Sequence, residues 1–412
     1  MIKKGFLFFC YTLLTILSYA QNKTLDYYLD QALINSPLLK DYRNQVQTNL
    51  LDSQRILAAY KPQVNGSSIN YYAPTINGYG YDNAITNGAQ ASAIVGVNKQ
   101  IVSKGNLNTQ FQGIQIQNRT LDNTSKLTEQ DIKRNVAAQY ITTYSDLQQI
   151  QFNREIIDLL HKEEVLLKQL TEKNVYRQSD YLTFLVSLKQ QELLLRQIQI
   201  QFRNNFATLN YLCGLSDTAS SNLQDPGIHL NELPDQYNSA FFQQFMLDSL
   251  KLINNRDLID FSYRPKLSLY ADGGYQSSLA YKPYKNFGAS AGVNLFVPIY
   301  DGHQRKLLYN KLAVDELTRT NYKDFFTRQY NQQQAQLRQQ LHGTEELLTE
   351  IKNQITYSEG LIRVNAKLLE TGDVTIPDYI IALNTYVNAR FLLTQNNITR
   401  LQIINQINYW NR

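Results

Sequence analysis

Residues 287–302 carry the clearest alternation of apolar and polar positions in the chain. Apolar side chains occupy every second position from Phe287 to Val297, and glycine, serine or asparagine stands between most of them. This period of two predicts a β-strand with one apolar face and one face of small or polar residues. Pro298 and the pair Asp301-Gly302 then end the strand.

A long helical pattern follows this strand. The segment 303–370 contains no proline and two glycines, Gly343 and Gly360. Its apolar residues recur at helical spacing, among them Leu337, Leu341, Leu348, Ile351 and Ile355. A helix of roughly 68 residues would be about 100 Å long at ~1.5 Å per residue, which is more than a globular domain needs.

The same order of patterns occurs earlier in the chain. Residues 89–98 alternate in the same way, and Gly96-Val97-Asn98 corresponds to Gly292-Val293-Asn294 at an offset of 196 residues (292 − 96). A second proline-free segment, 106–173, follows. The sequence therefore predicts an internal duplication. We expect one structural repeat over residues 21–220 and a second over residues 221–412, with the same order of elements in each.

The remaining segments complete these two repeats. In the first we expect a helix over 24–59 with a kink at Ser36-Pro37, strands over 63–72 and 88–98, and helices over 106–173 and 179–212. A linker over 215–236 leads to a helix over 237–261, strands over 266–275 and from 287, and helices over 303–370 and 375–409. Alternation is weakest in the first strand.

Residues 1–20 have the pattern of a signal peptide. Lys3 and Lys4 precede an apolar stretch, and Ser18-Tyr19-Ala20 is a small-x-small cleavage site. Cys10 lies inside this segment, so N-terminal lipidation is not expected. After cleavage Cys213 stands alone, which excludes a disulfide framework and a cysteine metal cluster.

Composition narrows the classes of function. The net charge is +5 without a basic run, so we expect no nucleic-acid binding. The histidines share no metal-ligand spacing, and no nucleophile or phosphate-loop motif occurs; the histidines are His161, His229, His303 and His342. We therefore expect no enzyme activity, no cofactor and no metal. Beyond the signal peptide the chain has no apolar run of about 18 residues, so no transmembrane helix is expected.

Strands of this length with one apolar face are typical of outer-membrane barrels. Four strands cannot close a barrel, and an open edge cannot lie in lipid, because its unpaired N–H and C=O groups would cost several kcal/mol each. Each chain should therefore contribute four strands to an oligomeric barrel, while the polar helices extend into an aqueous compartment as a hollow cylinder. The expected lipid-facing residues are Ala93, Val95, Val97, Leu267, Leu269, Val293 and Leu295.

Several motifs resemble those of the TolC-like family of outer-membrane efflux proteins, over essentially the whole chain after the signal peptide. They include Asn35-Ser36-Pro37, the strand-entry pairs Lys61-Pro62 and Arg264-Pro265, and the junction 297–302. The most specific is the segment 372–379, whose counterpart in the first half is 174–181.

This resemblance implies a mixed α/β outer-membrane channel. Its fold would be a trimeric 12-stranded antiparallel β-barrel continuous with a coiled-coil α-helical tunnel across the periplasm. The channel would be a passive export duct of a tripartite efflux or type I secretion system, with a periplasmic adaptor protein and an inner-membrane transporter as partners. The resemblance gives no basis for choosing the exported substrate or the class of pump.

In the family, the turns between long and return helices form the periplasmic mouth of the tunnel. The positions that match it here are Asn174, Asp180, Tyr181, Gly372, Thr375, Asp378 and Tyr379. Three-fold symmetry would bring the aspartates near the axis, where a carboxylate ring favours cations. A second acidic position of the family pattern is the apolar Ile381, which places a double ring in question.

Two simpler interpretations stay open. Thr375 and Asp378 also fit a helix capping box, and an acid in a first helical turn is favoured by the helix dipole. Tyr181 and Tyr379 fit packing positions between helices better than pore positions. For the whole chain, the alternative function is a soluble or envelope-associated coiled-coil protein with a structural or adhesive role. A single-chain diffusion porin is contradicted by the two long helices.

Overall fold

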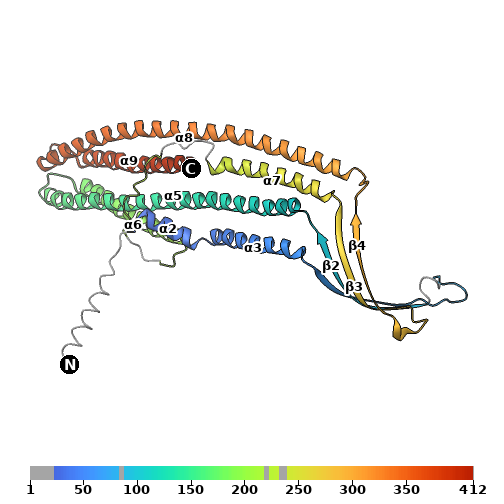
Figure 1. Ribbon diagram of the computed structural model, residues 1–412. Coiled ribbons are helices and arrows are strands. Elements are labelled where there is room, and N and C mark those ends of the chain that lie inside the picture. The colour runs from blue at the N-terminus through green and yellow to red at the C-terminus, as the bar shows by residue number, and fades with distance from the viewer. Residues whose placement is uncertain (1–22, 83–87, 218–221, 232–238, 412) are drawn as a thin grey trace, which may run out of the picture. The chain divides into compact units, whose positions relative to one another are not determined.

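The computed structural model describes residues 23–82, 88–217, 222–231 and 239–411. The expected signal peptide lies outside these ranges. The described elements follow the order α2 (Leu25–Asn35), α3 (Pro37–Ala59), β1 (Gln63–Tyr72), β2 (Ala89–Ile101), α5 (Lys104–Glu172), α6 (Gln178–Leu212), α7 (Ala240–Ser262), β3 (Lys266–Ser277), a 3-10 turn (Pro283–Lys285), β4 (Phe287–Phe296), α8 (Gln304–Thr371) and α9 (Ile376–Trp410). Figure 1 traces this order from the N-terminus to the C-terminus.

Most element boundaries agree with the sequence-based expectations. Helices α5 and α8 have 69 and 68 residues, and each half shows helix, two strands, long helix and return helix in that order. At Pro37 the expected kink is a full break between α2 and α3, because Ser36 leaves helical geometry with ψ 115°. Strand β2 extends to Ile101 and β3 to Ser277, and the 3-10 turn was not expected.

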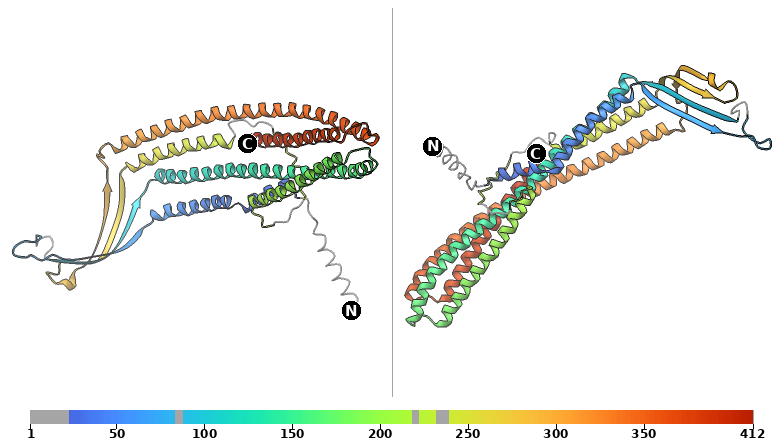
Figure 2. Two further views of the ribbon diagram at one scale, coloured as in Figure 1. Left: turned by 180° about the vertical axis from the view of Figure 1, so that it is seen from behind. Right: turned by 90° about the horizontal axis from the view of Figure 1, so that it is seen from below.

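The four strands form one antiparallel sheet in the order β1-β2-β3-β4, seen in Figures 1 and 2. The first strand pairs Gln63 with Asn98 and Tyr72 with Ala89. The register of β1, which the weak alternation left open, is thus defined. The outer edges of β1 and β4 have no neighbouring strand within the described part of the chain.

The chain divides into two compact units, and each takes segments from both sequence halves. One unit, Asp41–Ser125 with Ala240–Phe325, holds the sheet and is called the sheet unit. The other holds the residues up to Lys40, Lys126–Ser239 and Phe326–Arg412, and is called the bundle unit. In the bundle unit the hairpins α5/α6 and α8/α9 lie side by side (Figure 2, right). The expected repeats, 21–220 and 221–412, remain a prediction from the sequence.

The bundle unit has a segmented apolar core. A first cluster joins α2 to α5 and α6 around Tyr28, Tyr140 and Phe206, all at most 1% exposed. A second cluster joins both hairpins and contains Leu160, Leu167, Phe184, Leu188, Leu369, Ile376, Tyr379 and Leu383. Burial of these side chains, at about 25 cal/mol per Å² of apolar surface, holds the hairpins together.

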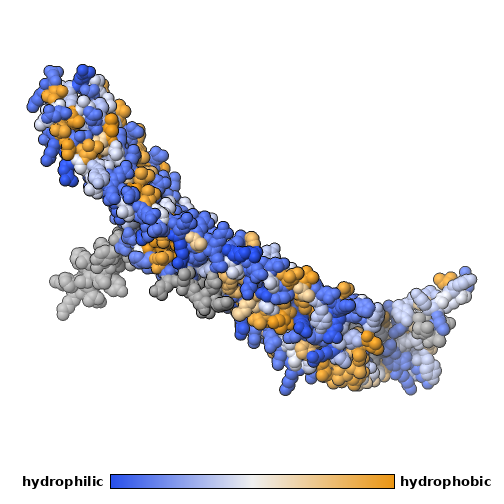
Figure 3. Space-filling view, turned by 90° about the horizontal axis from the view of Figure 1, so that it is seen from above, coloured by the Kyte–Doolittle hydropathy of each residue, from blue (hydrophilic) through white to orange (hydrophobic). Residues whose placement is uncertain are grey.

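The helical surfaces are largely polar. In the space-filling view most side chains on the face shown are hydrophilic, with hydrophobic ones scattered among them (Figure 3). Among the described residues, no helix combines the length and hydrophobicity that a membrane span requires.

Candidate functional site

The first helical hairpin turns at Asn174. This residue has a φ of +59°, in the left-handed region where asparagine is one of the few side chains tolerated. The N–H group of Val175 donates to the carbonyl oxygen of Leu170 at 2.9 Å, which caps the end of α5. The chain can then reverse within a few residues and enter α6.

The second hairpin repeats this geometry at Gly372. Its φ is +79°, and the N–H group of Asp373 donates to the carbonyl oxygen of Leu368 at 2.9 Å. Asn174 and Gly372 are related by an offset of 198 residues (372 − 174). The pairing of the two turns, inferred from the sequence, therefore holds in backbone conformation.

The entries to the two return helices differ. Thr375 caps α9: its hydroxyl oxygen accepts from the N–H group of Asp378 at 3.3 Å, and its hydroxyl group donates to the Asp378 carboxylate at 2.5 Å. This is the side-chain capping that the sequence indicates. Helix α6 begins after Arg177, which makes no side-chain capping bond. Asp180 lies in its first turn and accepts instead from the Ser179 hydroxyl at 3.3 Å.

A tyrosine joins the two turns. The Tyr176 hydroxyl contacts two carbonyl oxygens of the other hairpin, at 2.8 Å from Leu369 and 3.0 Å from Val374. Its single proton is shared between these acceptors. Partial burial raises the pKa of the Tyr176 phenol, so it stays protonated as a donor. This contact was not predicted from the sequence; its one sign there is that the counterpart of Tyr176 in the second half, Val374, is not a tyrosine.

The turns also touch directly. A Cβ atom at Gly372 would lie 3.1 Å from Cγ1 of Val175, which is tight for a carbon–carbon contact. Beneath the turns, Tyr379 is fully buried in the cluster that joins the hairpins, and Tyr181 packs against that cluster from α6. Both tyrosines thus occupy packing positions rather than solvent-facing ones.

The acidic groups near the turns are unequally exposed. Asp378 is exposed and Asp180 is half-buried, whereas Ile381 is 63% exposed. Glu163 on α5 is half-buried, and burial together with the nearby Glu370 carboxylate raises its pKa. A ring of aspartates around a symmetry axis remains a prediction, because it depends on further copies of the chain.

The sheet has two chemically distinct faces. Cross-strand register places the expected lipid-facing residues together: Val97 pairs with Ala271, Leu267 with Leu295, and Leu269 with Val293. The same register places the expected Ala93 and Val95 on this apolar face and adds Ala289 and Ala291 to it. Its one charged residue is Lys99, close to the helical end of β2.

The opposite face of the sheet is polar and small. It carries Asp272, whose carboxylate accepts from the Ser290 hydroxyl at 2.7 Å. The ring of Tyr270 covers Gly292 so closely that a Cβ atom there would lie 2.6 Å from the phenol oxygen. Serine, glycine, asparagine and glutamine fill most of the other positions on this face. Water beside this face would contact hydrogen-bonding side chains.

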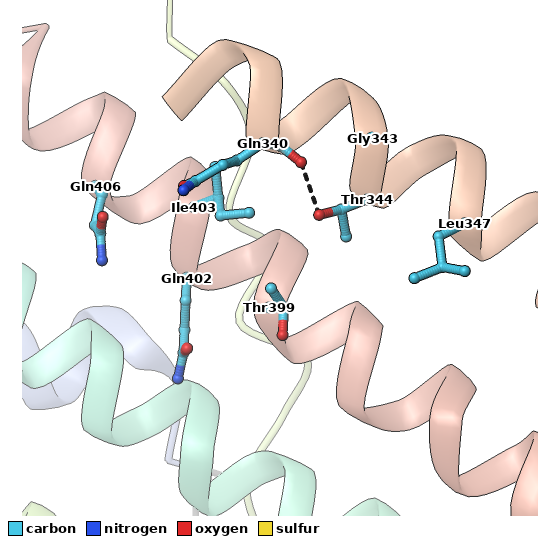
Figure 4. A pocket seen from close by; sticks show the side chains of 8 residues that line it. All are labelled: Gln340, Gly343, Thr344, Leu347, Thr399, Gln402, Ile403 and Gln406. Carbon is cyan, nitrogen blue, oxygen red and sulfur yellow. Dashed lines mark hydrogen bonds between the residues drawn. The ribbon is translucent and has the colours of Figure 1, made fainter. Parts of the chain in front are cut away.

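A groove of about 440 Å³ with an uncharged lining lies between α8 and α9 in the bundle unit. Figure 4 shows its lining: Gln340, Gly343, Thr344 and Leu347 from α8, and Thr399, Gln402, Ile403 and Gln406 from α9. Thr344 donates back to the carbonyl oxygen of Gln340 at 2.8 Å. None of these lining side chains is an acid or a base. Over the ranges the structure describes, no cluster of histidine, cysteine or carboxylate side chains could hold a metal.

Solved structures with the same fold include membrane channels. The chain matches CusC, studied for the conformational changes that accompany folding and transmembrane channel formation, with a TM-score of 0.76 and 12% identity over 95% of this chain and 92% of that chain. It matches the outer membrane protein VceC of Vibrio cholerae with a TM-score of 0.73 and 13% identity over 94% and 96%. It matches the CmeC outer membrane channel of Campylobacter jejuni with a TM-score of 0.71 and 13% identity, over 94% of this chain and 85% of that chain.

No protein-family model matches the sequence, and no curated protein matches it either. At 11–13% identity, the likeness to solved structures establishes the fold. The resemblance to TolC-like channels predicted from the sequence motifs is thus confirmed at the level of the fold.

Proposed function

We propose that this chain is the outer-membrane channel of an export system. It forms a passive duct through the outer membrane, and its helices line a tunnel through the periplasm. The observation that carries this proposal is the four-stranded sheet with one apolar face, one polar face and two open edges. The resemblance in fold to CusC, VceC and CmeC supports it.

The open edges argue for assembly. Backbone groups along β1 and β4 need partners if the apolar face is to lie in lipid. Three copies related by a threefold axis would pair β4 of one copy with β1 of the next and close a 12-stranded barrel. The face with Asp272 and Ser290 would then line the pore. The homotrimer is part of this proposal.

The helical hairpin turns form the mouth of the duct. Among the described residues no group of histidine, cysteine or carboxylate side chains could hold a metal ion, and the side chains that line the groove between α8 and α9 are uncharged. The proposal gives the chain no enzymatic role, and transport depends on partners. These are a periplasmic adaptor protein and an inner-membrane transporter that selects the cargo.

Membrane fractionation followed by native mass determination in mild detergent tests this function. We expect a species that requires detergent, has three times the mass of the processed chain and forms conducting channels in planar bilayers. A soluble monomer or dimer without conductance would contradict the proposal. That outcome would leave a coiled-coil envelope protein as the alternative.

A further inference from the structure

The β3–β4 hairpin ends in a loop with unusual side-chain chemistry. Residues 277–287 read SSLAYKPYKNF, so two Tyr-Lys pairs flank Pro283. No acidic residue occurs between Asp272 and Asp301, so the loop carries two positive charges with none opposing them in sequence. The β1–β2 connection differs: it contains Tyr79, Tyr81 and Asp82 but no lysine or arginine.

Hydrogen bonds fix the shape of this loop. The Ser277 hydroxyl, on a residue only 4% exposed, accepts from the N–H group of Leu279 at 3.0 Å and from the Asn286 amide at 2.7 Å. The N–H group of Gln276 donates to the carbonyl oxygen of Asn286 at 3.1 Å. Lys282 has a φ of +41°, a costly backbone conformation for a lysine. The surface that the loop presents is therefore well defined.

The two lysines bracket the 3-10 turn. The N–H group of Lys285 donates to the carbonyl oxygen of Lys282 at 3.0 Å, so both lysines belong to one turn of the backbone. Each ammonium group lies over the neighbouring ring, Lys282 at 5.1 Å from the centre of Tyr281 and Lys285 at 5.9 Å from the centre of Tyr284. Both rings are more than 70% exposed. Two cations and two phenols thus face solvent together.

The loop continues the apolar face of the sheet. Phe287, the first residue of β4, is 74% exposed and packs against Tyr275 of β3, with ring centres 5.3 Å apart and the rings tilted at 59°. The aliphatic side chains of this face end at the Tyr275–Phe287 pair, and the loop beyond that pair carries two tyrosines and two lysines. Tyrosine with lysine at the end of an apolar surface is the composition of a membrane–water interface.

We propose that this loop binds the phosphate groups of an anionic lipid surface, with Lys282 and Lys285 as the cationic contacts and Tyr281 and Tyr284 seated among the headgroups. The inference rests on the proposed function, which places the strand-connecting loops at the outer face of the membrane. A lipid fits better than a soluble anion, because the exposed apolar side chains of Leu279 and Phe287 adjoin the lysines. A lysine side chain near a membrane is attracted most strongly to anionic, phosphate-bearing headgroups.

Native mass spectrometry of the purified protein in neutral detergent tests the inference. The probes are lipid A with two phosphates and the same lipid after enzymatic dephosphorylation. The double variant Lys282→Gln, Lys285→Gln is compared with a matched control, Lys306→Gln, Lys311→Gln, which removes two exposed lysines of α8 in the same unit. We expect the wild type and the control to prefer the phosphorylated lipid, and the loop variant to bind it about tenfold more weakly.

Equal binding of the two lipids by the wild type would overturn the inference, as would equal losses in the loop and control variants. Full displacement by inorganic phosphate at matched phosphate concentration would also overturn it, since the site would then bind free phosphate. The proposed function is assessed separately by conductance in neutral bilayers. If the protein conducts but shows no lipid preference, only the inference is overturned. If it neither inserts nor conducts, the proposed function is overturned.

Discussion

The Tyr176 hydroxyl lies 2.8 Å from the carbonyl oxygen of Leu369, so a side chain in the turn of one helical hairpin is bonded to the end of the long helix of the other. This bond crosses between the two halves of the duplicated chain. It lies above the apolar cluster that packs α5 and α6 against α8 and α9. The relative position of the two turns thus depends on one phenol as well as on apolar packing.

Replacing that phenol should loosen the turns. Tyr176→Phe keeps the ring but removes the donor to Leu369 and Val374, which should cost about 1 kcal/mol of stability. In the proposed channel we also expect a higher single-channel conductance, because the mouth opens more easily. Chemical unfolding and planar-bilayer recordings measure the two effects.

The control is Tyr357→Phe, at a tyrosine of α8 that is 79% exposed. Its effect on unfolding should stay within about 0.5 kcal/mol. If both variants have the same conductance as the wild type, the bond has no part in gating.

Backbone conformation should make a Cβ atom at Gly372 costly. Gly372→Ala forces a side chain to φ +79° and places its Cβ atom 3.1 Å from Val175. We expect a loss of about 1–2 kcal/mol in the free energy of unfolding. The matched control is Gly343→Ala, within α8, where a Cβ atom would meet nothing within 4 Å. That variant should gain about 0.5–1 kcal/mol, because alanine favours helix more than glycine does. A destabilised Gly343→Ala would contradict this account.

Two variants separate capping from a role in the pore. Thr375→Ala removes the acceptor for the N–H group of Asp378 and should lower stability by about 1 kcal/mol. Asp378→Asn keeps a polar side chain at the cap but removes the charge. If three copies of Asp378 line the mouth, we expect weaker block by multivalent cations and altered conductance. Thr375→Ala should not change cation block. Identical cation block in Asp378→Asn and the wild type would leave only the capping role.

Asp146 predicts a pH dependence of stability. It is 3% exposed, its carboxylate accepts from the Asn205 amide at 2.6 Å, and burial raises its pKa above the ordinary 3.8. The folded state therefore binds the proton more tightly than the unfolded chain. The stability that Asp146 contributes is present at low pH and is lost as the pH rises from about 4 through the raised pKa.

Asp146→Asn should accordingly gain about 1 kcal/mol over the wild type at pH 7 and less at pH 4. Thermal unfolding across this pH range measures the difference. Asp158→Asn changes an exposed aspartate of the same helix and serves as the control. If the gain of Asp146→Asn is the same at both pH values, charge burial at Asp146 is not its cause.

Periodicity and turn chemistry were enough to predict most of the fold. The first strand was placed at Gln63–Tyr72 from its bounding residues although its alternation is weak, and Pro37 marked the interruption between α2 and α3. Asn174 could be paired with Gly372 because few residues tolerate a left-handed backbone. These are local properties, which the sequence encodes directly.

Contacts between distant segments were harder to foresee. The bond from Tyr176 to Leu369 joins residues 193 positions apart and depends on how two hairpins pack, which periodicity does not encode. The same limit applies to Glu163 and Glu370, which approach each other from α5 and α8. The 3-10 turn at Pro283–Lys285 was missed because three residues are too few to show a period.

The unpaired edges of β1 and β4 carry a kinetic consequence for the proposed channel. A lone protomer cannot cross the bilayer at low cost, because both edges would lose their hydrogen bonds to water without gaining others. In water the same edges are templates for aggregation. Insertion and assembly should therefore be one concerted event, whose rate rises steeply with protomer concentration, and newly exported chains would need protection until their partners arrive.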